Sequence, residues 1–343
     1  MSEDTNNEPA PQSRSDLPVG IYFGLSEAEY FADVANGSSD MKRLSYSPPD
    51  WFWESRWNPL WVPEKSTPAQ IQGRAKHTII LEGRAKFESL YGRKTLNYAT
   101  TEGKKQKERF AAEGKTPLDQ DEYDRAIVLG EIVKANPYLS NAFEGAVATE
   151  LSVLWMRDGI KRKARIDCFK HRAIVDLKNI SNDREIPFPK AALRYIDNYS
   201  GHVQAAHYAE ARLAMRGLLE QGLVFGDGYD PDALKAAVME PAFAFVFVFA
   251  QASGAPLTWS FKLSFKPARE WADEDGEVHT DPEEVNEMFR LGRVAIERAE
   301  RNYKAYLERY GLTSAWLLAE PIEELDISSM PSWFVRNAEG EGI

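Results

Sequence analysis

The chain has 343 residues, of which 43% are hydrophobic, and a formal net charge of −11. This content suffices for a sizeable core in one large domain or two small ones, and the charge argues against a surface that is basic overall, although it leaves room for a local basic groove. The one cysteine, Cys168, excludes an intrachain disulfide and a four-cysteine zinc or iron–sulfur site. No apolar run reaches the ~20 residues of a membrane span, and residues 1–16 lack the apolar core of a signal peptide. We therefore expect a cytoplasmic protein with no membrane contact.

Composition and turn signals predict one α/β domain between two tails. Residues 1–18, rich in Asn, Pro, Ser and acidic residues, are predicted to be disordered. The domain is expected to span residues 19–311, and residues 312–343 are expected to form a tail that packs on this domain or on a neighbouring subunit. Helices are predicted at residues 67–82, 119–135, 200–219 and 281–310. Strands are predicted as a three-strand meander over residues 148–179 and a hairpin over residues 243–265.

An aromatic stretch, WFWESRWNPLW, precedes the first of these helices and holds tryptophans at positions 51, 53, 57 and 61. The four rings follow no single helical period. Two interpretations stay open: the rings pack into the core or into a lid over the domain, or they form a wedge that stacks on nucleobases near a strand end.

The first turn of the meander is marked by Asp158-Gly159, a strong signal for a two-residue hairpin loop. A turn there pairs Arg157 with Ile160. The same register places Glu150 directly opposite Asp167.

The second turn of the meander, at residues 171–172, would place Asp167 opposite Asp176. Directly opposite side chains lie about 5 Å apart, and like charges at that distance repel each other. Lys178 falls on the same face as Asp176, because strand side chains alternate with period two. Carboxylates that converge on a hard divalent ion beside an ammonium group suit phosphodiester hydrolysis. The alternative is that the two aspartates form cross-strand ion pairs with Arg165, Lys163 or Arg172.

Four motifs follow one another along the chain: GRAKH at residues 73–77, KARID at 163–167, IVDLK at 174–178 and QAAHY at 204–208. Together they resemble the PD-(D/E)XK nuclease superfamily, and more specifically the exodeoxyribonuclease VIII (RecE-type) branch of phage recombination exonucleases. The resemblance covers residues 19–310 and departs from the family pattern at Ile166, where proline is common. It implies an α/β fold of the restriction-endonuclease-like type, with a central mixed β-sheet flanked by helices.

The resemblance also implies a set of metal ligands. Asp167 and Asp176 would bind Mg²⁺ directly, and the backbone carbonyl of Leu177 would complete the shell of oxygens that this ion prefers. Glu150 would bind through water or belong to a second metal site. His77 would be a ligand of the second metal, and because nitrogen suits Mn²⁺ better than Mg²⁺, Mn²⁺ is expected to substitute. The alternative for His77 is a packed or capping histidine.

Three further side chains have roles implied by the resemblance. Lys178 would position or deprotonate the attacking water and stabilise the charge of the transition state. Gln204 and Tyr208 are four residues apart and share one face of a helix. They would orient Lys178 or the water, or contact a phosphate. The alternative is an Ala-rich packing helix that tolerates a glutamine.

A compact basic segment, residues 161–172, is a candidate for binding the DNA backbone. Arg165 points to the same face as Asp167 and could hold a phosphate. Lys163 and Arg172 would add contacts that do not depend on base sequence. The alternative is a solvated strand edge.

The function implied by the resemblance is that of a metal-dependent exodeoxyribonuclease. It would digest linear duplex DNA from an end, with 5′→3′ polarity, and leave a 3′ single-stranded overhang for recombination or repair. Its expected partners are double-stranded DNA ends, further copies of itself in a trimeric or tetrameric ring, and a single-strand annealing recombinase, in a bacterial host that carries a phage or prophage. Two alternatives stay open: a structure-specific or sequence-specific endonuclease on the same core, and a non-catalytic DNA-binding or assembly protein.

Overall fold

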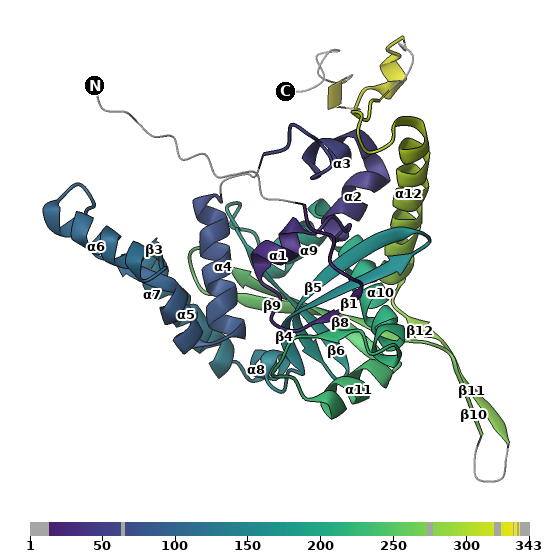
Figure 1. The fold of residues 1–343 in the computed structure, drawn as a ribbon, viewed down its shortest axis with the longest axis horizontal. Helices are drawn as coiled ribbons and strands as arrows, with labels where there is room; N and C mark the ends of the chain where they lie inside the picture. The colour runs from purple at the N-terminus through teal and green to yellow at the C-terminus, as the bar shows by residue number, and fades with distance from the viewer. Residues whose placement is uncertain are drawn as a thin grey trace.

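The computed structural model describes residues 14–62, 66–272, 277–318, 324–331, 333–334 and 336. The main sheet is built from β1 (Gly20–Tyr22), β4 (Ala148–Arg157), β5 (Ile160–Lys170), β6 (Ala173–Ile180), β7 (Val224–Phe225), β8 (Phe243–Gln251), β9 (Thr258–Lys266) and β12 (Glu284–Val285). These eight strands run in the order β12-β9-β8-β6-β5-β4-β1-β7. β6 pairs with β8 in parallel, whereas its other neighbour, β5, is antiparallel. The predicted central mixed sheet is therefore confirmed (Figure 1).

Both tight turns of the meander form where the sequence predicts them. Arg157 pairs with Ile160 across Asp158-Gly159, and Lys170 pairs with Ala173 across residues 171–172. Asp158 and Gly159 both have positive φ, at 50° and 79°. This is the conformation that a two-residue hairpin loop needs to match the twist of its strands.

Helices cover both faces of the sheet. They are α1 (Glu27–Ala32), α2 (Ser38–Tyr46), α3 (Pro48–Glu54), α4 (Pro68–Leu81), α5 (Arg84–Leu90), α6 (Thr101–Ala112), α7 (Gln120–Ala135), α8 (Pro137–Phe143), α9 (Phe188–Asn198), α10 (Gly201–Glu220), α11 (Pro231–Met239) and α12 (Glu287–Tyr310). The side chains of β8 show how helices pack on both faces of the sheet, because successive side chains of a strand point to opposite faces. Phe245, Phe247 and Phe249 pack with α9, α10 and α11, while Val248 and Ala250 pack with α4 and α7.

Both tails contact the domain. Ser15 donates its backbone N–H to the carbonyl of Ala32 over 3.0 Å, and Leu17 donates to Asp33 over 2.7 Å. The ordered chain therefore begins before residue 19, and residues 1–13 lie outside the described part. At the other end, Trp316 is buried against Trp51 of α3 and against α12. The start of the expected C-terminal tail thus packs on this domain.

The predicted helix over residues 281–310 begins later than expected, at Glu287. Pro282 disfavours helical backbone in the residue before it, and Asn286 caps α12 by accepting a hydrogen bond from the N–H of Met288. Residues 278–285 instead supply β12 and the strand β11 (Val278–Asp281), which pairs with β10 (Arg269–Ala272).

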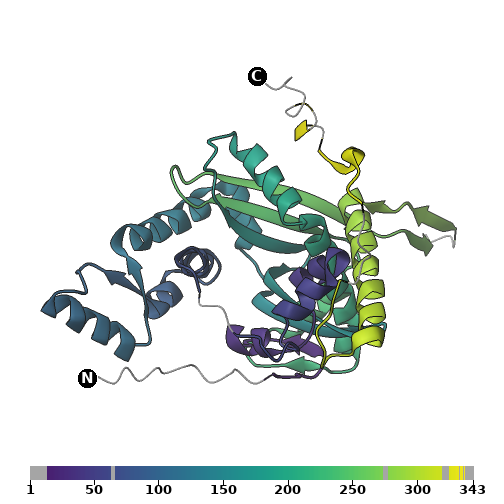
Figure 2. The ribbon, with the colours of Figure 1, turned by 90° about the horizontal axis from the view of Figure 1, so that it is seen from above.

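Two projections leave the body of the molecule on opposite sides (Figures 1 and 2). One is the β10–β11 hairpin. The other contains α5, α6 and two short parallel strands, β2 (Tyr91–Lys94) and β3 (Thr116–Asp119). Within the part of the chain that the structure describes, no helix has the length and apolarity needed to cross a membrane.

Candidate active site

A cavity of about 1240 Å³ lies where the sheet meets α1, α2, α4 and the junction of α9 with α10. Most of the residues that the motifs single out line it. They are His77, Glu150, Lys163, Arg165, Asp167, Lys178, Gln204 and Tyr208. Asp176 is almost fully buried beside them, bonded to both Lys178 and Gln204. Motifs that are far apart in the sequence thus meet at one place in the fold.

Three of the predicted metal ligands converge on one point. One ligand atom from each of His77, Glu150 and Asp167 lies within 4.8 Å of the other two. They come from α4, β4 and β5. Nδ1 of His77 is 3.8 Å from Oδ2 of Asp167. A nitrogen and two carboxylates at this spacing can share one divalent ion.

Glu150 reaches this point through an unusual backbone conformation. The predicted register holds on both sides of it, since Thr149 pairs with Cys168 and Leu151 pairs with Ile166. Glu150 itself makes no ladder pair and has a φ of 52°. A non-glycine residue in the left-handed region is strained, and such strain gathers at functional sites. A local twist of β4 therefore directs this carboxylate, without any slip in register.

Asp176 and Asp167 are joined through the backbone between their strands. The β5–β6 ladder ends at Cys168 and Val175, so the two aspartates do not form the expected ladder pair. Instead the N–H of Leu177 donates to Oδ2 of Asp167 over 2.8 Å. This contact uses the N–H of Leu177, so the predicted role of its carbonyl as a metal ligand stays a prediction.

The two carboxylate oxygens of Asp176 have different surroundings. Oδ1 accepts hydrogen bonds from Nζ of Lys178 at 2.8 Å and from Nε2 of Gln204 at 2.7 Å. Oδ2 is buried and has no hydrogen-bond partner. A buried carboxylate oxygen without a partner is costly, because it has lost its water and gained nothing in return. A cation bound there would remove that cost, so the donor set fits a divalent metal.

The charges of the site shift the pKa values of its members. Burial, together with the negative charge of Asp176, raises the pKa of Asp167 well above its usual range. Burial also raises the pKa of Glu150, although Arg165 opposes the shift. For Lys178, burial opposes the charged form, but the carboxylates of Asp176 and Asp167 outweigh it and raise the pKa. The excess of negative charge is what a bound cation would neutralise.

His77 is held in the form that binds metals. Burial, and then the charge of Lys178, lower the pKa of His77 to about 4. The imidazole is therefore neutral near pH 7, as a metal ligand must be. A neutral imidazole is compatible with a metal ligand and with a packed histidine, and the nearness of His77 to Glu150 and Asp167 is what points to a ligand.

The three predicted DNA-binding residues lie in three different surroundings. Arg165 lies in the cavity, where its guanidinium donates to Glu150 over 2.6 Å. Lys163 also borders the cavity, but its ammonium is buried and donates to the backbone carbonyls of Tyr30 and Asp33. Arg172 lies at the β5–β6 turn, 73% exposed in its side chain, and pairs with Glu240. Of the three, only Arg165 has its charged group at the site.

Gln204 and Tyr208 share a helix face, as predicted, and both reach the site. Gln204 contacts Asp176. The hydroxyl of Tyr208 donates to the backbone carbonyl of Arg165 over 2.9 Å. Burial raises the pKa of Tyr208 well above its usual range, which keeps the hydroxyl protonated. Tyr208 thus holds the β5 backbone, while Gln204 holds a predicted metal ligand.

Several residues of the cavity were not expected from the sequence. Lys42 reaches it from α2, and burial followed by the charge of Lys178 lowers the pKa of Lys42 to about 8. Tyr195 and Tyr199 enter from the end of α9, and Trp57 and Trp61 from the aromatic stretch. No spacing rule connects these positions to the motifs. The packing interpretation holds for Trp51, which is buried in the core and also borders the cavity; Trp57 and Trp61 border the cavity too, and their stacking on nucleobases stays a prediction.

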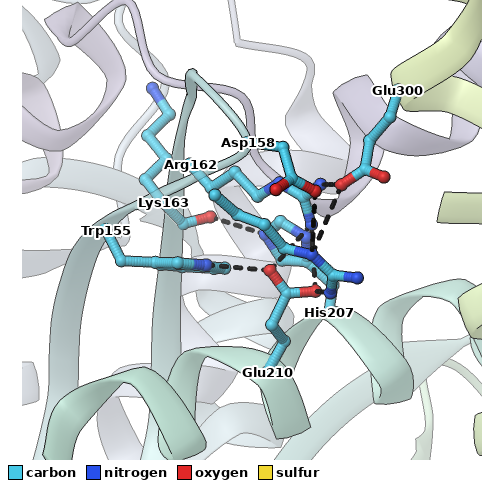
Figure 3. A network of polar contacts seen from close by, with 8 residues as sticks. Trp155, Asp158, Arg162, Lys163, His207, Glu210 and Glu300 are labelled. Carbon is cyan, nitrogen blue, oxygen red and sulfur yellow. Dashed lines mark hydrogen bonds and ion pairs between the residues drawn. The ribbon is translucent and has the colours of Figure 1, made fainter. Parts of the chain in front are cut away.

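A buried polar network fixes α10 against the meander (Figure 3). Glu210 of α10 accepts hydrogen bonds from Nε1 of Trp155 at 2.9 Å and from Arg162 at 2.8 Å. Arg162 also contacts Glu300 of α12. Nε2 of His207 bonds to the carbonyl oxygen of Lys163 at 2.9 Å. Because α10 carries Gln204 and Tyr208, this network positions the side chains that face the cavity.

Comparison with known proteins gives three results. Residues 38–220, more than half of the chain, match the family described as "PDDEXK-like domain of unknown function (DUF3799)". Among curated proteins, none matches this sequence. The chain is similar to a solved structure from Eubacterium rectale described as a "Putative exonuclease", at 14% identity and a TM-score of 0.45, over 84% of this chain and 91% of that chain.

The family match agrees with the geometry. The matched range holds Asp167, Asp176, Lys178 and Gln204, and it spans the meander and α10 on which they lie. The mixed sheet flanked by helices is the fold that the sequence motifs imply. This protein belongs to the PDDEXK-like family (DUF3799) and, with it, to the PD-(D/E)XK superfamily.

Proposed function

We propose that this protein is a metal-dependent exodeoxyribonuclease that hydrolyses phosphodiester bonds of linear duplex DNA from an end. The observation that carries the proposal is the unpartnered Oδ2 of Asp176, buried next to Lys178 and to the group of His77, Glu150 and Asp167. The negative charge of these carboxylates is not balanced by the neighbouring cations. A bound divalent ion would supply the missing positive charge, and its water would supply a nucleophile for phosphodiester hydrolysis.

Five residues of the site are the proposed metal ligands. Asp167, Asp176 and the carbonyl of Leu177 would hold one metal, and His77 and Glu150 would be ligands of a second. Mg²⁺ is the expected ion, and Mn²⁺ is expected to substitute because of the imidazole ligand.

The remaining polar side chains orient the reactants. Lys178 remains charged, since the neighbouring carboxylates raise its pKa, and its ammonium stabilises negative charge that develops on the phosphate. Gln204 keeps Asp176 in one orientation. Arg165 holds Glu150 and faces a phosphate of the strand.

The choice of an exonuclease rests on the sequence resemblance to the RecE-type branch and on the walls of the cavity. The cavity is lined by residues within 24–61 and 73–91 and by strands of the sheet. A strand that enters by its end needs less opening of these walls than an internal loop of duplex. The 5′→3′ polarity, the 3′ overhang, a trimeric or tetrameric ring and an annealing partner in recombination follow from the resemblance and are proposed with it.

The test compares two forms of one DNA molecule. The full chain is incubated with a linear duplex and with the same duplex as a covalently closed circle, in Mg²⁺, in Mn²⁺ and in EDTA. The proposal expects loss of the linear form alone and only with metal. Nicking of the circle would show an endonuclease on the same core, and binding without cleavage in both metals would show a non-catalytic DNA-binding protein.

The same assay tests the polarity of digestion and the assignment of the catalytic residues. A linear duplex labelled at one 5′ end or one 3′ end shows from which end nucleotides are released, and 5′ release is expected. Asp176→Asn and Lys178→Met are expected to abolish cleavage, whereas Arg216→Met, an exposed residue of α10 that pairs with Glu220, is expected to leave it unchanged. An active Asp176→Asn protein would overturn the assignment of the site.

A further inference from the structure

The cavity contains a cation that none of the motifs explains. Lys42 lies on α2, close enough to Lys178 and Asp176 for their charges to affect it. Its neighbours Met41 and Leu44 are fully buried against α10 and α12, and they anchor the helix. This packing leaves Lys42 on the side of α2 that borders the cavity.

Lys42 has no partner among the residues that the structure describes, whereas three other cations of the cavity are paired. Arg165 pairs with Glu150, Lys178 with Asp176, and Arg43 with Glu54. The ammonium of Lys42 is half-buried and makes no hydrogen bond or ion pair with any residue that the structure describes. A cation that has lost part of its water without gaining a partner is a natural site for an anion.

An aromatic platform lines the same cavity. The rings of Tyr195 and Tyr199 lie 4.3 Å apart, and Tyr195 is fixed by the edge of Phe249. Tyr199 is 58% exposed and lines the cavity, so its ring is accessible to a ligand there. Ser200, which follows it, has a φ of 48° and is the N-cap of α10. This strained turn holds Tyr199 at the helix junction from which Gln204 reaches the site.

The cation and the aromatic ring suit a ligand that carries both a phosphate and a base. An ammonium group binds the phosphate of a nucleotide, and an open aromatic ring stacks on any nucleobase without regard to sequence. A base can stack on a protein ring only after it has left its own stack. A ligand with both features is an unpaired nucleotide.

We propose that Lys42 and Tyr199 form a nucleotide subsite beside the metal ligands, in which Lys42 binds a phosphate and Tyr199 stacks on the base of an unpaired nucleotide. The identity of the strand as DNA rests on the proposed function. With this subsite, the protein binds single-stranded nucleic acid at the reaction centre. The strand to be cut therefore separates from its complement before it reaches Asp176.

The test measures binding in the absence of cleavage. The full chain is titrated into a short single-stranded oligodeoxynucleotide that carries 2-aminopurine at each position in turn, in EDTA and in Ca²⁺. Fluorescence anisotropy of an end label gives the Kd, and quenching of 2-aminopurine reports stacking. The variants are Lys42→Met, Tyr199→Ala and Tyr199→Phe, and the control is Lys190→Met, an exposed lysine on α9.

The subsite predicts a separate signature for each variant. Lys42→Met raises the Kd about tenfold and reduces the slope of log K against log salt by about 0.7, the loss of one phosphate contact on a single strand. Tyr199→Ala raises the Kd about tenfold and removes the quenching at one oligonucleotide position, since a stacked base is lost. Tyr199→Phe keeps the ring and the quenching. Lys190→Met binds as the unmodified protein does.

Other outcomes overturn the subsite. These are an unmodified protein that binds no oligonucleotide in either condition, a Lys42→Met protein that binds like Lys190→Met, and quenching that persists in Tyr199→Ala. Thermal melting of each variant excludes loss of the fold as the cause.

Failure of the subsite and failure of the nuclease are distinguishable. If the unmodified protein cleaves DNA with the same KM as Lys42→Met and Tyr199→Ala, the subsite is wrong and the nuclease stands. If it binds the oligonucleotide through Lys42 and Tyr199 but cleaves nothing in Mg²⁺ or Mn²⁺, the subsite stands and the proposed function is wrong.

Discussion

The side-chain amide of Gln204 and the carboxylate of Asp176 are joined by a hydrogen bond of 2.7 Å. The bond connects α10 to β6 across 28 positions of sequence. Lys178 donates to the same oxygen, so Oδ1 is saturated and Oδ2 is the oxygen left without a partner. The amide thus decides which oxygen of Asp176 is free to accept a cation.

Replacement of Gln204 by alanine is therefore expected to weaken metal use. Side chains that orient a metal ligand are worth about 10–100-fold in metal affinity or activity. We expect Gln204→Ala to raise the Mg²⁺ concentration for half-maximal cleavage by a factor in this range. Gln221→Ala, an exposed position at the end of α10, is the control and should leave the Mg²⁺ titration unchanged. Equal titrations for the two variants would contradict the role given to Gln204.

Metal binding is expected to stabilise the folded protein. Asp167 and Glu150 both have raised pKa values in the metal-free site, which means that their charges are unfavourable there. A ligand that binds only the folded state adds about 2.7 kcal/mol at one hundred times its Kd. We expect Mg²⁺ or Mn²⁺ to raise the Tm measured by differential scanning fluorimetry.

Asp167→Asn should separate the two contributions. The substitution removes one of the crowded charges, so the metal-free Tm is expected to rise. It also removes a ligand, so the shift on adding metal is expected to vanish. Asp183→Asn, at an exposed loop position, should change neither quantity. A lower metal-free Tm for Asp167→Asn would show that the charges at the site are not in conflict.

His207 is expected to make the stability of the protein depend on pH. Burial lowers the pKa of His207 to about 4, while an unfolded histidine titrates near 6.5. The folded-state pKa is depressed, so the stabilising effect of neutral His207 is complete above about pH 6.5 and is lost as the pH falls towards 4. The total loss is about 3 kcal/mol, since each pKa unit corresponds to about 1.4 kcal/mol.

The measurement is the free energy of unfolding in urea at pH 7.5 and pH 4.5. His207→Gln should show a smaller decrease between these two values than the unmodified protein, because it has lost the titrating group. His171→Gln is the control, since that ring lies at the exposed β5–β6 turn. If all three proteins show the same decrease, His207 is not the group responsible.

Glu210 is expected to be a major source of stability. It is the shared partner of Trp155, Arg157 and Arg162 (Figure 3). Arg162 is fully buried, and Glu210→Ala leaves its charge with Glu300 as the one remaining ion-pair partner among the residues that the structure describes. Breaking a buried pair in this way costs about 3–5 kcal/mol. Urea denaturation should show a loss near the lower end of this range.

The matched control is Glu220→Ala on the same helix. Glu220 pairs with Arg216 on the surface, and an exposed pair of this kind is worth about 0.3–0.5 kcal/mol. A double variant, Arg162→Met with Glu210→Leu, should recover part of the loss, because no unpaired charge remains. A Glu210→Ala protein as stable as Glu220→Ala would contradict the view of the network as a structural anchor.

Local signals in the sequence predict the three strands of the meander and both of its tight turns. Asp158-Gly159 supplies two residues that accept positive φ, and strand alternation then sets which side chains share a face. These signals are local, so they predict the turns and the contact between Asp176 and Lys178. The order of the motifs adds the superfamily and the mixed sheet.

Contacts between distant parts of the chain complete the site. His77 and Lys42 lie on α4 and α2, which are far from the meander in the sequence. The hydrophobic contacts of these two helices place both side chains in the cavity. Glu150 depends on a single backbone torsion that its residue type does not favour. Lys163 looks like a surface cation in the sequence, yet two carbonyls of the N-terminal segment bury its ammonium. Long-range packing sets each of these positions, and no local pattern records it, because the energy that holds them comes from residues far away in the chain.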